Sequence, residues 1–190
     1  MGKRMAIFAS GAGSNARRLM QHGCRSSYYE VVLVLTDRLA SGVQLHAKEF
    51  SVPVEQLQWK DTTPNVILEI LARYKVDFIV LAGFLRCIPK GVVDNFSQRI
   101  VNLHPSLLPK YGGKGMFGRN VHRAVFNAQE AQTGITIHYV SEKYDEGPII
   151  KQVAVNISPD DDVDAIELKV RHLESQHFVN TVEDVCKNTL

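Results

Sequence analysis

The chain has 190 residues, of which 45% are hydrophobic and 22% are charged, and its formal net charge is +2. This composition is typical of a globular protein and excludes the collagen, disordered and disulfide-scaffold classes. The length suits one domain, so we expect residues 1–190 to form a single domain. Lysines and arginines are scattered along the chain, so we expect small-molecule partners, with no nucleic acid and no membrane.

The cysteines indicate a reducing compartment. Cys24, Cys87 and Cys186 lie far apart and form no C-x-x-C pair, which argues against a zinc ribbon, a redox dithiol and a secreted disulfide framework. The apolar run near the N-terminus is too short for a signal-peptide core or a membrane span. We therefore expect a cytoplasmic protein.

A glycine motif follows the first predicted strand, Met5 to Ala9. The motif, Ser10-Gly11-Ala12-Gly13-Ser14-Asn15-Ala16, opens a helix. Glycines let the backbone approach a ligand, and the free N–H groups of a helix start hold an anion. The motif therefore predicts a phosphate site at Gly13, Ser14 and Asn15.

The same motif also fits a dinucleotide-binding fold. Gly11-x-Gly13-x-x-Ala16 matches the fingerprint, and Asp37, after the strand Val31 to Leu35, stands where a ribose-binding acid is expected. The motif alone leaves an NAD(P)-dependent oxidoreductase open.

The middle of the chain alternates a helix with buried strands. Thr62-Thr63-Pro64 is a helix start, and one face of that helix carries Val66, Ile67, Ile70 and Leu71. The apolar run Phe78 to Leu81 is typical of a central parallel strand. The segment after it, Leu81 to Pro89, suits either a flat aromatic ligand or the core.

The strand Arg99 to Leu103 ends in a candidate reaction centre. Asn102 and His104 are two residues apart, so a strand places an amide donor and a titratable imidazole on one face. Ligands of open α/β sheets bind beyond the carboxyl ends of the strands, where this pair falls. We expect the exit from this strand to contain a cis peptide at Leu108-Pro109.

A glycine-rich segment precedes the last third of the chain, which is expected to form a hairpin and a helix. Gly112 to Gly118 has too many glycines for regular structure, and we expect it to be mobile near the substrate entrance. Strands Gly134 to Val140 and Ile149 to Ile157 are joined through a turn containing Asp145. Asp160 to Asp162 cap a final helix.

Asp145 has two interpretations. Taken alone, it belongs to a solvated turn of Asp, Gly and Pro. In contact with His104, its carboxylate would raise the pKa of the histidine. The spacing of His104, His122, His138 and Asp145 contains no H-x-x-x-H or H-E-x-x-H pattern, so we expect no metal.

The elements together predict an α/β fold, a Rossmann-like open, mostly parallel sheet with helices on both faces and a C-terminal β-hairpin plus helix. Taken in order, four segments resemble the folate-dependent formyltransferases over nearly the whole chain. These segments are Ser10-Gly11-x-Gly13-Ser14-Asn15, Leu81-Ala82-Gly83-Phe84-Leu85-Arg86, Asn102-x-His104-Pro105-Ser106-Leu107-Leu108-Pro109 and Asp145-x-Gly147-Pro148.

The resemblance implies formyl transfer from 10-formyltetrahydrofolate, as cosubstrate, to the amine of phosphoribosylglycinamide in purine synthesis. It implies that Asn102, His104 and Asp145 are catalytic, with a phosphate at Gly13, Ser14 and Asn15 and a weaker substrate contact at Glu174. The folate would contact Leu85, Arg86, Cys87, Ile88, Ser141 and Tyr144. The alternatives are the NAD(P)-dependent oxidoreductase and a non-catalytic folate or nucleotide-binding protein. We expect a monomer or a homodimer.

The chain departs from the family pattern at three places. A longer glycine-rich stretch follows Tyr111, and Glu174 lacks the Tyr-Pro that commonly follows it. An arginine that often serves the folate has no counterpart around residues 60–65, so Lys60 or Lys90 is the expected contact for the glutamate tail.

Overall fold

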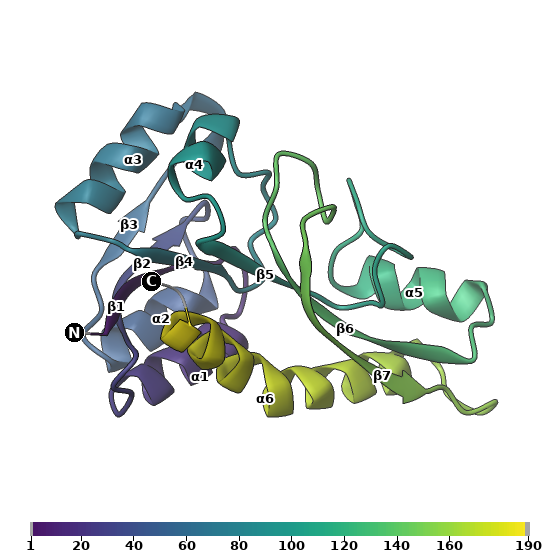
Figure 1. Cartoon of the computed structure of the whole chain (residues 1–190). Helices are drawn as coiled ribbons and strands as arrows, with labels where there is room; N and C mark the ends of the chain where they lie inside the picture. Colours follow the sequence, from purple (N-terminus) through teal and green to yellow (C-terminus); the bar gives the residue numbers. More distant parts are fainter. Residues whose placement is uncertain (1, 189–190) are drawn as a thin grey trace.

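The computed structural model describes residues 2–188, which fold into one seven-stranded sheet covered by helices (Figure 1). The strands are β1 (Lys3–Phe8), β2 (Tyr29–Thr36), β3 (Val54–Gln56), β4 (Phe78–Leu81), β5 (Ile100–His104), β6 (Gln132–Tyr139) and β7 (Ile149–Asn156). The helices are α1 (Ser14–Gly23), α2 (Gly42–Glu49), η1 (Trp59–Asp61), α3 (Pro64–Arg73), α4 (Lys90–Asn95), α5 (Arg119–Asn127) and α6 (Val163–Asn188).

The sheet has the order β3-β2-β1-β4-β5-β6-β7. The pairs from β3 to β5 are parallel, whereas β5–β6 and β6–β7 are antiparallel. This arrangement confirms the predicted mostly parallel sheet and its C-terminal hairpin. The chain moves outward from β1 through β2 to β3 and then returns to β4 on the other side of β1. The loops after β1 and β4 therefore diverge, and this topological switch point is where open α/β sheets bind ligands.

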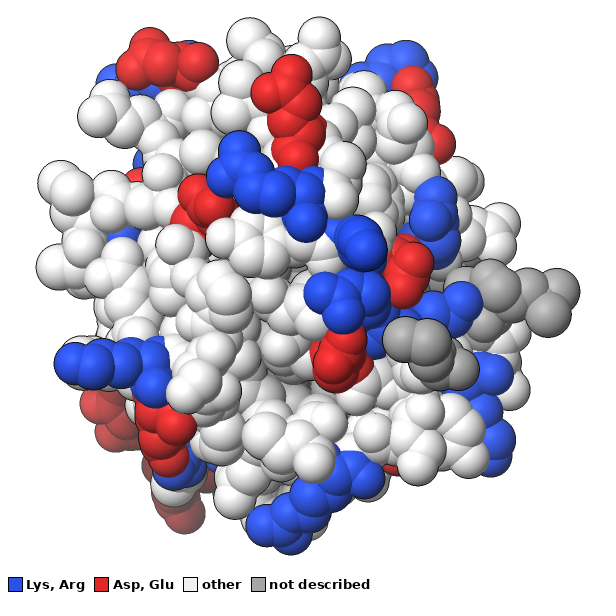
Figure 2. Space-filling model, turned by 90° about the vertical axis from the view of Figure 1, so that its left-hand side faces the viewer, with Lys and Arg blue, Asp and Glu red and all other residues white. Residues whose placement is uncertain are grey.

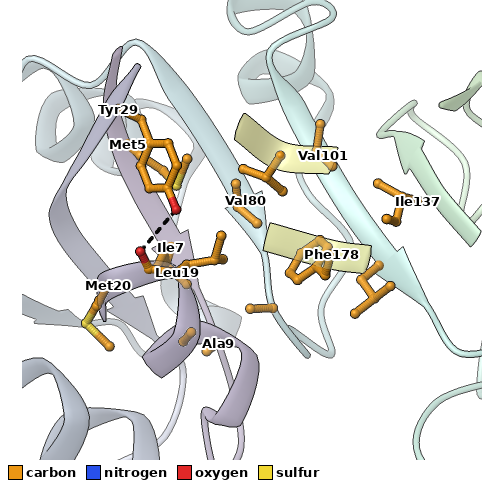
Figure 3. Packing of buried hydrophobic residues seen from close by; sticks show 14 of the residues in the cluster. Met5, Ile7, Ala9, Leu19, Met20, Tyr29, Val80, Val101, Ile137 and Phe178 are labelled. Atoms are coloured by element: carbon orange, nitrogen blue, oxygen red, sulfur yellow. Dashed lines mark hydrogen bonds between the residues drawn. The ribbon is translucent and has the colours of Figure 1, made fainter. Parts of the chain in front are cut away.

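One face of the sheet packs on α1, α2 and α6. Figure 3 shows Phe178 of α6 and Leu19 of α1 among apolar strand residues such as Val80, all of which belong to one buried cluster. In the same view the Tyr29 hydroxyl donates a hydrogen bond to the Leu19 carbonyl at 3.2 Å. The polar atom is satisfied, so the ring contributes its apolar area to the core without an unpaired hydroxyl.

The opposite face packs on α3 and α4 (Figure 1). Helix α3 begins as predicted, with Pro64 in its first turn and the Thr63 hydroxyl accepting a hydrogen bond from the Val66 amide at 3.5 Å. Its buried residues are Ile67, Ile70 and Leu71. The expectation that Val66 shares this face is wrong, because Val66 lies at the edge of the stripe and is 39% exposed.

The C-terminal elements also follow the prediction. β6 and β7 pair antiparallel, and the Asp162 carboxylate accepts a hydrogen bond from the Ala165 amide at 2.8 Å, which caps the start of α6. The Leu108-Pro109 peptide is cis, as expected. The backbone around it is held by the Thr136 hydroxyl, which accepts from the Leu108 amide at 3.0 Å.

The surface charges are mixed. On the face shown in Figure 2, lysine and arginine side chains are interspersed with aspartate and glutamate side chains. Within residues 2–188, every helix is either too short or too polar to cross a membrane.

Candidate active site

A cavity of about 610 Å³ lies at the switch point of the sheet. Its walls come from the segment after β1, the segment after β4, the end of β5, the glycine-rich segment, the turn between β6 and β7, and one stripe of α6. Nearly all predicted site residues line it: Ser14, Asn15, Leu85, Arg86, Cys87, Ile88, Asn102, His104, Ser141, Tyr144, Asp145 and Glu174. Segments that are far apart in the sequence thus form one site.

The glycine motif places the start of α1 at one end of this cavity. Gly13 precedes the helix with φ +79°, in the left-handed region that glycine tolerates, and a Cβ there would lie 2.7 Å from Val43. Gly13 therefore lets α1 approach α2 closely, while the next residues, Ser14 and Asn15, line the cavity. The first N–H groups of a helix lack intrahelical acceptors, so this end of the cavity is suited to an anion.

Asn15 connects this helix start to α6. Its Nδ2 donates to the Glu174 carboxylate at 2.8 Å, and its Oδ1 accepts from the Arg18 guanidinium at 3.0 Å. The structure thus brings together two residues predicted to bind the same substrate. Burial raises the pKa of Glu174, and the Asn15 hydrogen bond and the nearby Arg171 and Arg18 oppose that rise only in part.

Two charged residues at this end were not predicted. Glu167 and Arg171 precede Glu174 on α6 and also line the cavity. The three are spaced i, i+4 and i+7, which places them on one helix face. This spacing is visible in the sequence, but the final helix offers charged residues on several faces, and only the packing of α6 shows which face meets the cavity.

The opposite end is the candidate reaction centre. Asn102 and His104 come from β5, and Asp145 comes from the turn before β7. The His104 Nδ1 lies 3.4 Å from Asp145 Oδ2, and the Asn102 Nδ2 lies 3.4 Å from Asp145 Oδ1. The interpretation of Asp145 as a solvated turn residue is wrong, because only 9% of its side chain is exposed.

Local backbone geometry explains how the turn reaches this place. Asp145 has φ +57°, in the left-handed region, which aspartate adopts more readily than most residues. A Cβ on Gly147 would lie 1.7 Å from the Tyr139 carbonyl oxygen, so only glycine fits there. The Asp-x-Gly pattern thus folds the turn tightly against β6 and directs the carboxylate inward.

His138 is a member of the centre that the sequence did not predict. The antiparallel register sets His138 of β6 opposite Asn102, and the His138 side chain is only 2% exposed. Its Nδ1–H donates to the Tyr139 carbonyl at 2.8 Å, so in the neutral ring Nε2 accepts from Asn102 Nδ2 at 3.1 Å. The same Nε2 lies 3.6 Å from Asp145 Oδ1.

The pKa of His104 differs from the expectation. Burial lowers it below the ordinary value, and this effect outweighs the opposing attraction of Asp145 and the hydrogen bond to the Tyr111 carbonyl. The predicted net increase is therefore wrong for this arrangement, although the contribution of Asp145 has the predicted sign. Burial also acts to raise the pKa of Asp145, but His138, His104 and the Gly113 amide together hold it below its usual range.

The start of the glycine-rich segment closes over this centre. The His104 Nε2–H donates to the Tyr111 carbonyl at 2.8 Å, and the Gly113 amide donates to Asp145 Oδ2 at 2.9 Å. A Cβ on Gly112 would lie 2.6 Å from Leu108 Cδ2. Residues 113–118 line the cavity, so the segment lies at the site as expected. Its mobility stays a prediction.

The segment after β4 forms the third wall. Leu85, Arg86, Cys87 and Ile88 line the cavity together with Ser141 and Tyr144. Neither Lys60 nor Lys90 belongs to the lining, and Lys90 pairs with Glu142 and Asp94. Arg86 and Lys143 are the basic residues that do line this side of the cavity.

Asp37 does not stand free as a ribose-binding acid would. Its carboxylate Oδ2 accepts from the Arg86 Nε at 2.7 Å, and only 1% of its side chain is exposed. Asp37 is also absent from the cavity lining. The structural basis for the dinucleotide alternative, a free acid beside the glycine motif, is therefore missing.

His122 of α5 is a second histidine in the cavity wall that received no role from the sequence. It is buried, its Nδ1 has no hydrogen-bond partner within residues 2–188, and burial lowers its pKa. Across the same residues, no three His, Cys, Asp or Glu side chains are grouped so as to hold a metal ion.

Comparison with known proteins identifies the family. The formyl transferase family model matches residues 3–182. The chain is 36% identical to the chloroplastic phosphoribosylglycinamide formyltransferase of Arabidopsis thaliana, over 99% of this chain and 67% of that protein. It is 32% identical to the phosphoribosylglycinamide formyltransferase of Bacillus subtilis, over 96% of this chain and 94% of that protein.

Solved structures agree with these sequence matches. The crystal structure of phosphoribosylglycinamide formyltransferase from Bacillus halodurans has a TM-score of 0.88 at 33% identity, and the match covers 98% of this chain and 96% of that one. The corresponding structure from Anaplasma phagocytophilum has a TM-score of 0.89 at 26% identity, over 99% of this chain and 89% of that one. The chain therefore belongs to the formyl transferase family.

Proposed function

We propose that this chain transfers the formyl group of 10-formyltetrahydrofolate to the amine of phosphoribosylglycinamide, the third step of purine synthesis. The observation that carries the proposal is the single cavity that joins a helix start suited to an anion, the Asn102–His104–Asp145 centre and an apolar wall. The relatives named phosphoribosylglycinamide formyltransferase, which match nearly the whole chain, support the same substrates.

The two substrates enter from opposite ends of the cavity. The phosphate lies at the start of α1, against Gly13, Ser14 and Asn15, because unpaired helix N–H groups and the helix dipole attract an anion there. Glu174 accepts from hydroxyl or amine groups of the same substrate. The folate ring lies on the segment Leu85–Ile88, where the side chains of Leu85 and Ile88 give an apolar surface that suits a flat heterocycle.

The residues at the centre meet the needs of formyl transfer. When the amine attacks the formyl carbon, negative charge develops on the formyl oxygen, and donors aimed at that oxygen stabilise it. Asn102 and His104 supply these donors, since both line the cavity from one face of β5. Asp145 holds His104 in orientation and favours its charged form.

His104 must exchange a partner to act. Its ring nitrogens face the Tyr111 carbonyl and the Asp145 carboxylate. A substrate oxygen therefore takes the place of the Tyr111 carbonyl, which belongs to the segment that begins the glycine-rich loop. The amine proton then passes to the leaving folate nitrogen through water, and the scheme needs neither a covalent enzyme intermediate nor a metal.

A transfer assay with a binding screen tests this proposal. The purified chain is expected to form formylated phosphoribosylglycinamide from both substrates, and to be stabilised against heat by a 10-formyl folate analogue but not by NADH. Binding of both substrates without turnover would indicate a non-catalytic binding protein. Stabilisation by NADH alone would favour the oxidoreductase and contradict the proposal.

Three further expectations accompany this function. We propose that the whole chain acts as one formyltransferase domain, in keeping with a family match over residues 3–182. We propose the cytoplasm as its compartment, because Cys24, Cys87 and Cys186 are free thiols. A monomer or homodimer stays a prediction, which the molar mass in solution tests.

A further inference from the structure

Asp37 is buried at the end of β2 although it has no place in the proposed chemistry. Its side chain is 1% exposed, and Oδ2 receives the Nε–H of Arg86 at 2.7 Å. The other oxygen, Oδ1, is buried and accepts no hydrogen bond within residues 2–188. Burying an oxygen without a hydrogen-bond partner costs folding free energy, so stabilisation of the fold alone does not explain this ion pair.

Ser10 connects the same carboxylate to the backbone of the folate segment. Its hydroxyl oxygen accepts the Leu85 amide at 3.1 Å. Burial acts to raise the pKa of Asp37, but hydrogen bonds from Ser10 and Arg86 hold it below its usual range. The carboxylate is therefore charged at neutral pH, with Arg86 as the donor to Oδ2 and the Ser10 hydroxyl beside it.

These contacts hold two successive residues of the cavity wall. The Leu85 amide is held through Ser10, and the Arg86 side chain is held by Asp37 directly. The Ser10 amide in turn donates to the Gly83 carbonyl at 3.1 Å. The segment is thus fixed to the ends of β1 and β2 before any ligand arrives, and a wall ordered in advance costs less entropy on binding.

The ion pair also limits the positions of the Arg86 guanidinium. A guanidinium has five N–H donors, and only Nε–H forms a hydrogen bond within residues 2–188. Because the arginine lines the cavity and is partly exposed, its other donors remain available to an anionic part of a ligand. Without Asp37 the side chain would sample many rotamers.

We propose that Asp37 is a positioning residue for the folate cosubstrate, acting through Arg86 and, by way of Ser10, through Leu85. This inference rests on the proposed function, and it assigns a role to the acid that the sequence offered to a dinucleotide. Asp37 itself does not line the cavity, so its effect is on the binding of one cosubstrate and not on the chemical step.

The test is a double-mutant cycle of Asp37→Asn and Arg86→Gln. Asp37→Asn keeps the shape and removes the charge, and we expect the KM for 10-formyltetrahydrofolate to rise about tenfold, which corresponds to about 1.4 kcal/mol. The KM for phosphoribosylglycinamide and kcat should stay within about twofold of wild type. In the Arg86→Gln background, Asp37→Asn should add little, because its effect passes mainly through that arginine.

Glu49→Gln is the matched control. It breaks a second ion pair between a carboxylate and an arginine, Arg17–Glu49. The Arg17 nitrogen and the Glu49 oxygen are also 2.7 Å apart, but this pair lies on the surface away from the cavity. We expect no change in either KM. An equal rise in both KM values with Asp37→Asn, or the same rise with and without Arg86, would overturn the positioning role.

A second variant covers the case in which Asp37→Asn does not fold. Ser10→Ala removes one hydroxyl and should raise the folate KM about threefold with little change in thermal stability. An unchanged folate KM in that variant overturns the proposal. The wild type separates the two claims: if it transfers no formyl group, the proposed function fails, whereas normal transfer with an unaffected Asp37→Asn variant refutes the positioning role alone.

Discussion

Two ends of one cavity carry a buried carboxylate, and their surroundings have opposite effects. Asp145 lies between two imidazoles, and these, with a backbone amide, hold its pKa below the usual range despite burial. Glu174 has an amide donor, Asn15, and more distant arginines, so burial prevails and raises its pKa. Burial acts on both carboxylates in the same direction, so the partners of each one set its charge.

The two ends also differ in how they are built. The reaction end stands on adjacent strands, where the register of β5 and β6 sets His138 opposite Asn102. The anion end is assembled from the start of α1 and a stripe of α6, joined by the Asn15–Glu174 hydrogen bond. We therefore expect substitutions at the strand-built end to lower kcat and substitutions at the helix-built end to raise KM.

The largest effect is expected for His104→Ala. Loss of the donor to the developing oxyanion should lower kcat by a factor on the order of 10² to 10⁴, while both substrates still bind. Steady-state kinetics with a calorimetric titration of each substrate measures the two effects separately. Full activity in this variant would contradict the proposed mechanism. It would also contradict the assignment of kcat effects to the strand-built end.

Asn102→Ala should come next. One oxyanion donor is lost, which costs about 3 kcal/mol of transition-state stabilisation, or roughly two orders of magnitude in kcat. Asn102 also donates to His138, so thermal unfolding serves as the control for misfolding. A variant that only raised KM would place Asn102 with the binding residues.

Asp145→Asn tests the electrostatics of the reaction end. The pKa of His104 is already lowered by burial, and Asp145 is the main influence that raises it. Removing the negative charge should lower the pKa of His104 further. As the pH rises, the activity that depends on the imidazolium should therefore begin to decline at a lower pH in the variant than in the wild type. The profile of kcat against pH for variant and wild type measures this shift. An unshifted profile with near-normal activity would show that Asp145 only shapes the turn.

Asn15→Ala tests the helix-built end. It removes the hydrogen bond that Asn15 donates to the Glu174 carboxylate and the one that it accepts from Arg18. Hydrogen bonds to charged groups contribute about 1.5–3 kcal/mol. We expect the KM for phosphoribosylglycinamide to rise about tenfold with kcat largely kept. Arg17→Gln, on α1 but paired with surface Glu49, is the control. A fall in kcat at unchanged KM would contradict the expectation that the helix-built end acts on substrate binding.

The smallest effect is expected away from both ends. Thr63→Ala removes the hydroxyl that caps α3, and the loss of such a cap costs about 1 kcal/mol of unfolding free energy. Urea denaturation measures the loss, and both KM values and kcat should match wild type. A change in kcat or in either KM would mean that the packing of α3 on the sheet influences the active site.

Much of the scaffold could be predicted because its signals are local. Apolar runs give the central strands, Thr63 and Pro64 give the start of α3, and Asp162 caps α6. The helices α2, α4 and α5 and the edge strand β3 were not predicted, since elements of three to nine residues carry too few residues to show a clear period.

In the site, local sequence pattern is enough to place Asn102 and His104 on one face of a strand and Gly13 at the start of a helix. Three features of the site depend on the folded chain: His138 completes the centre, Arg86 holds Asp37, and burial outweighs Asp145 in setting the pKa of His104. The two sets of features differ in the sequence separation over which their interactions act. Capping, strand alternation and turn geometry act over a few neighbouring residues, whereas strand register, burial and ion pairing join groups that lie tens of residues apart in the chain.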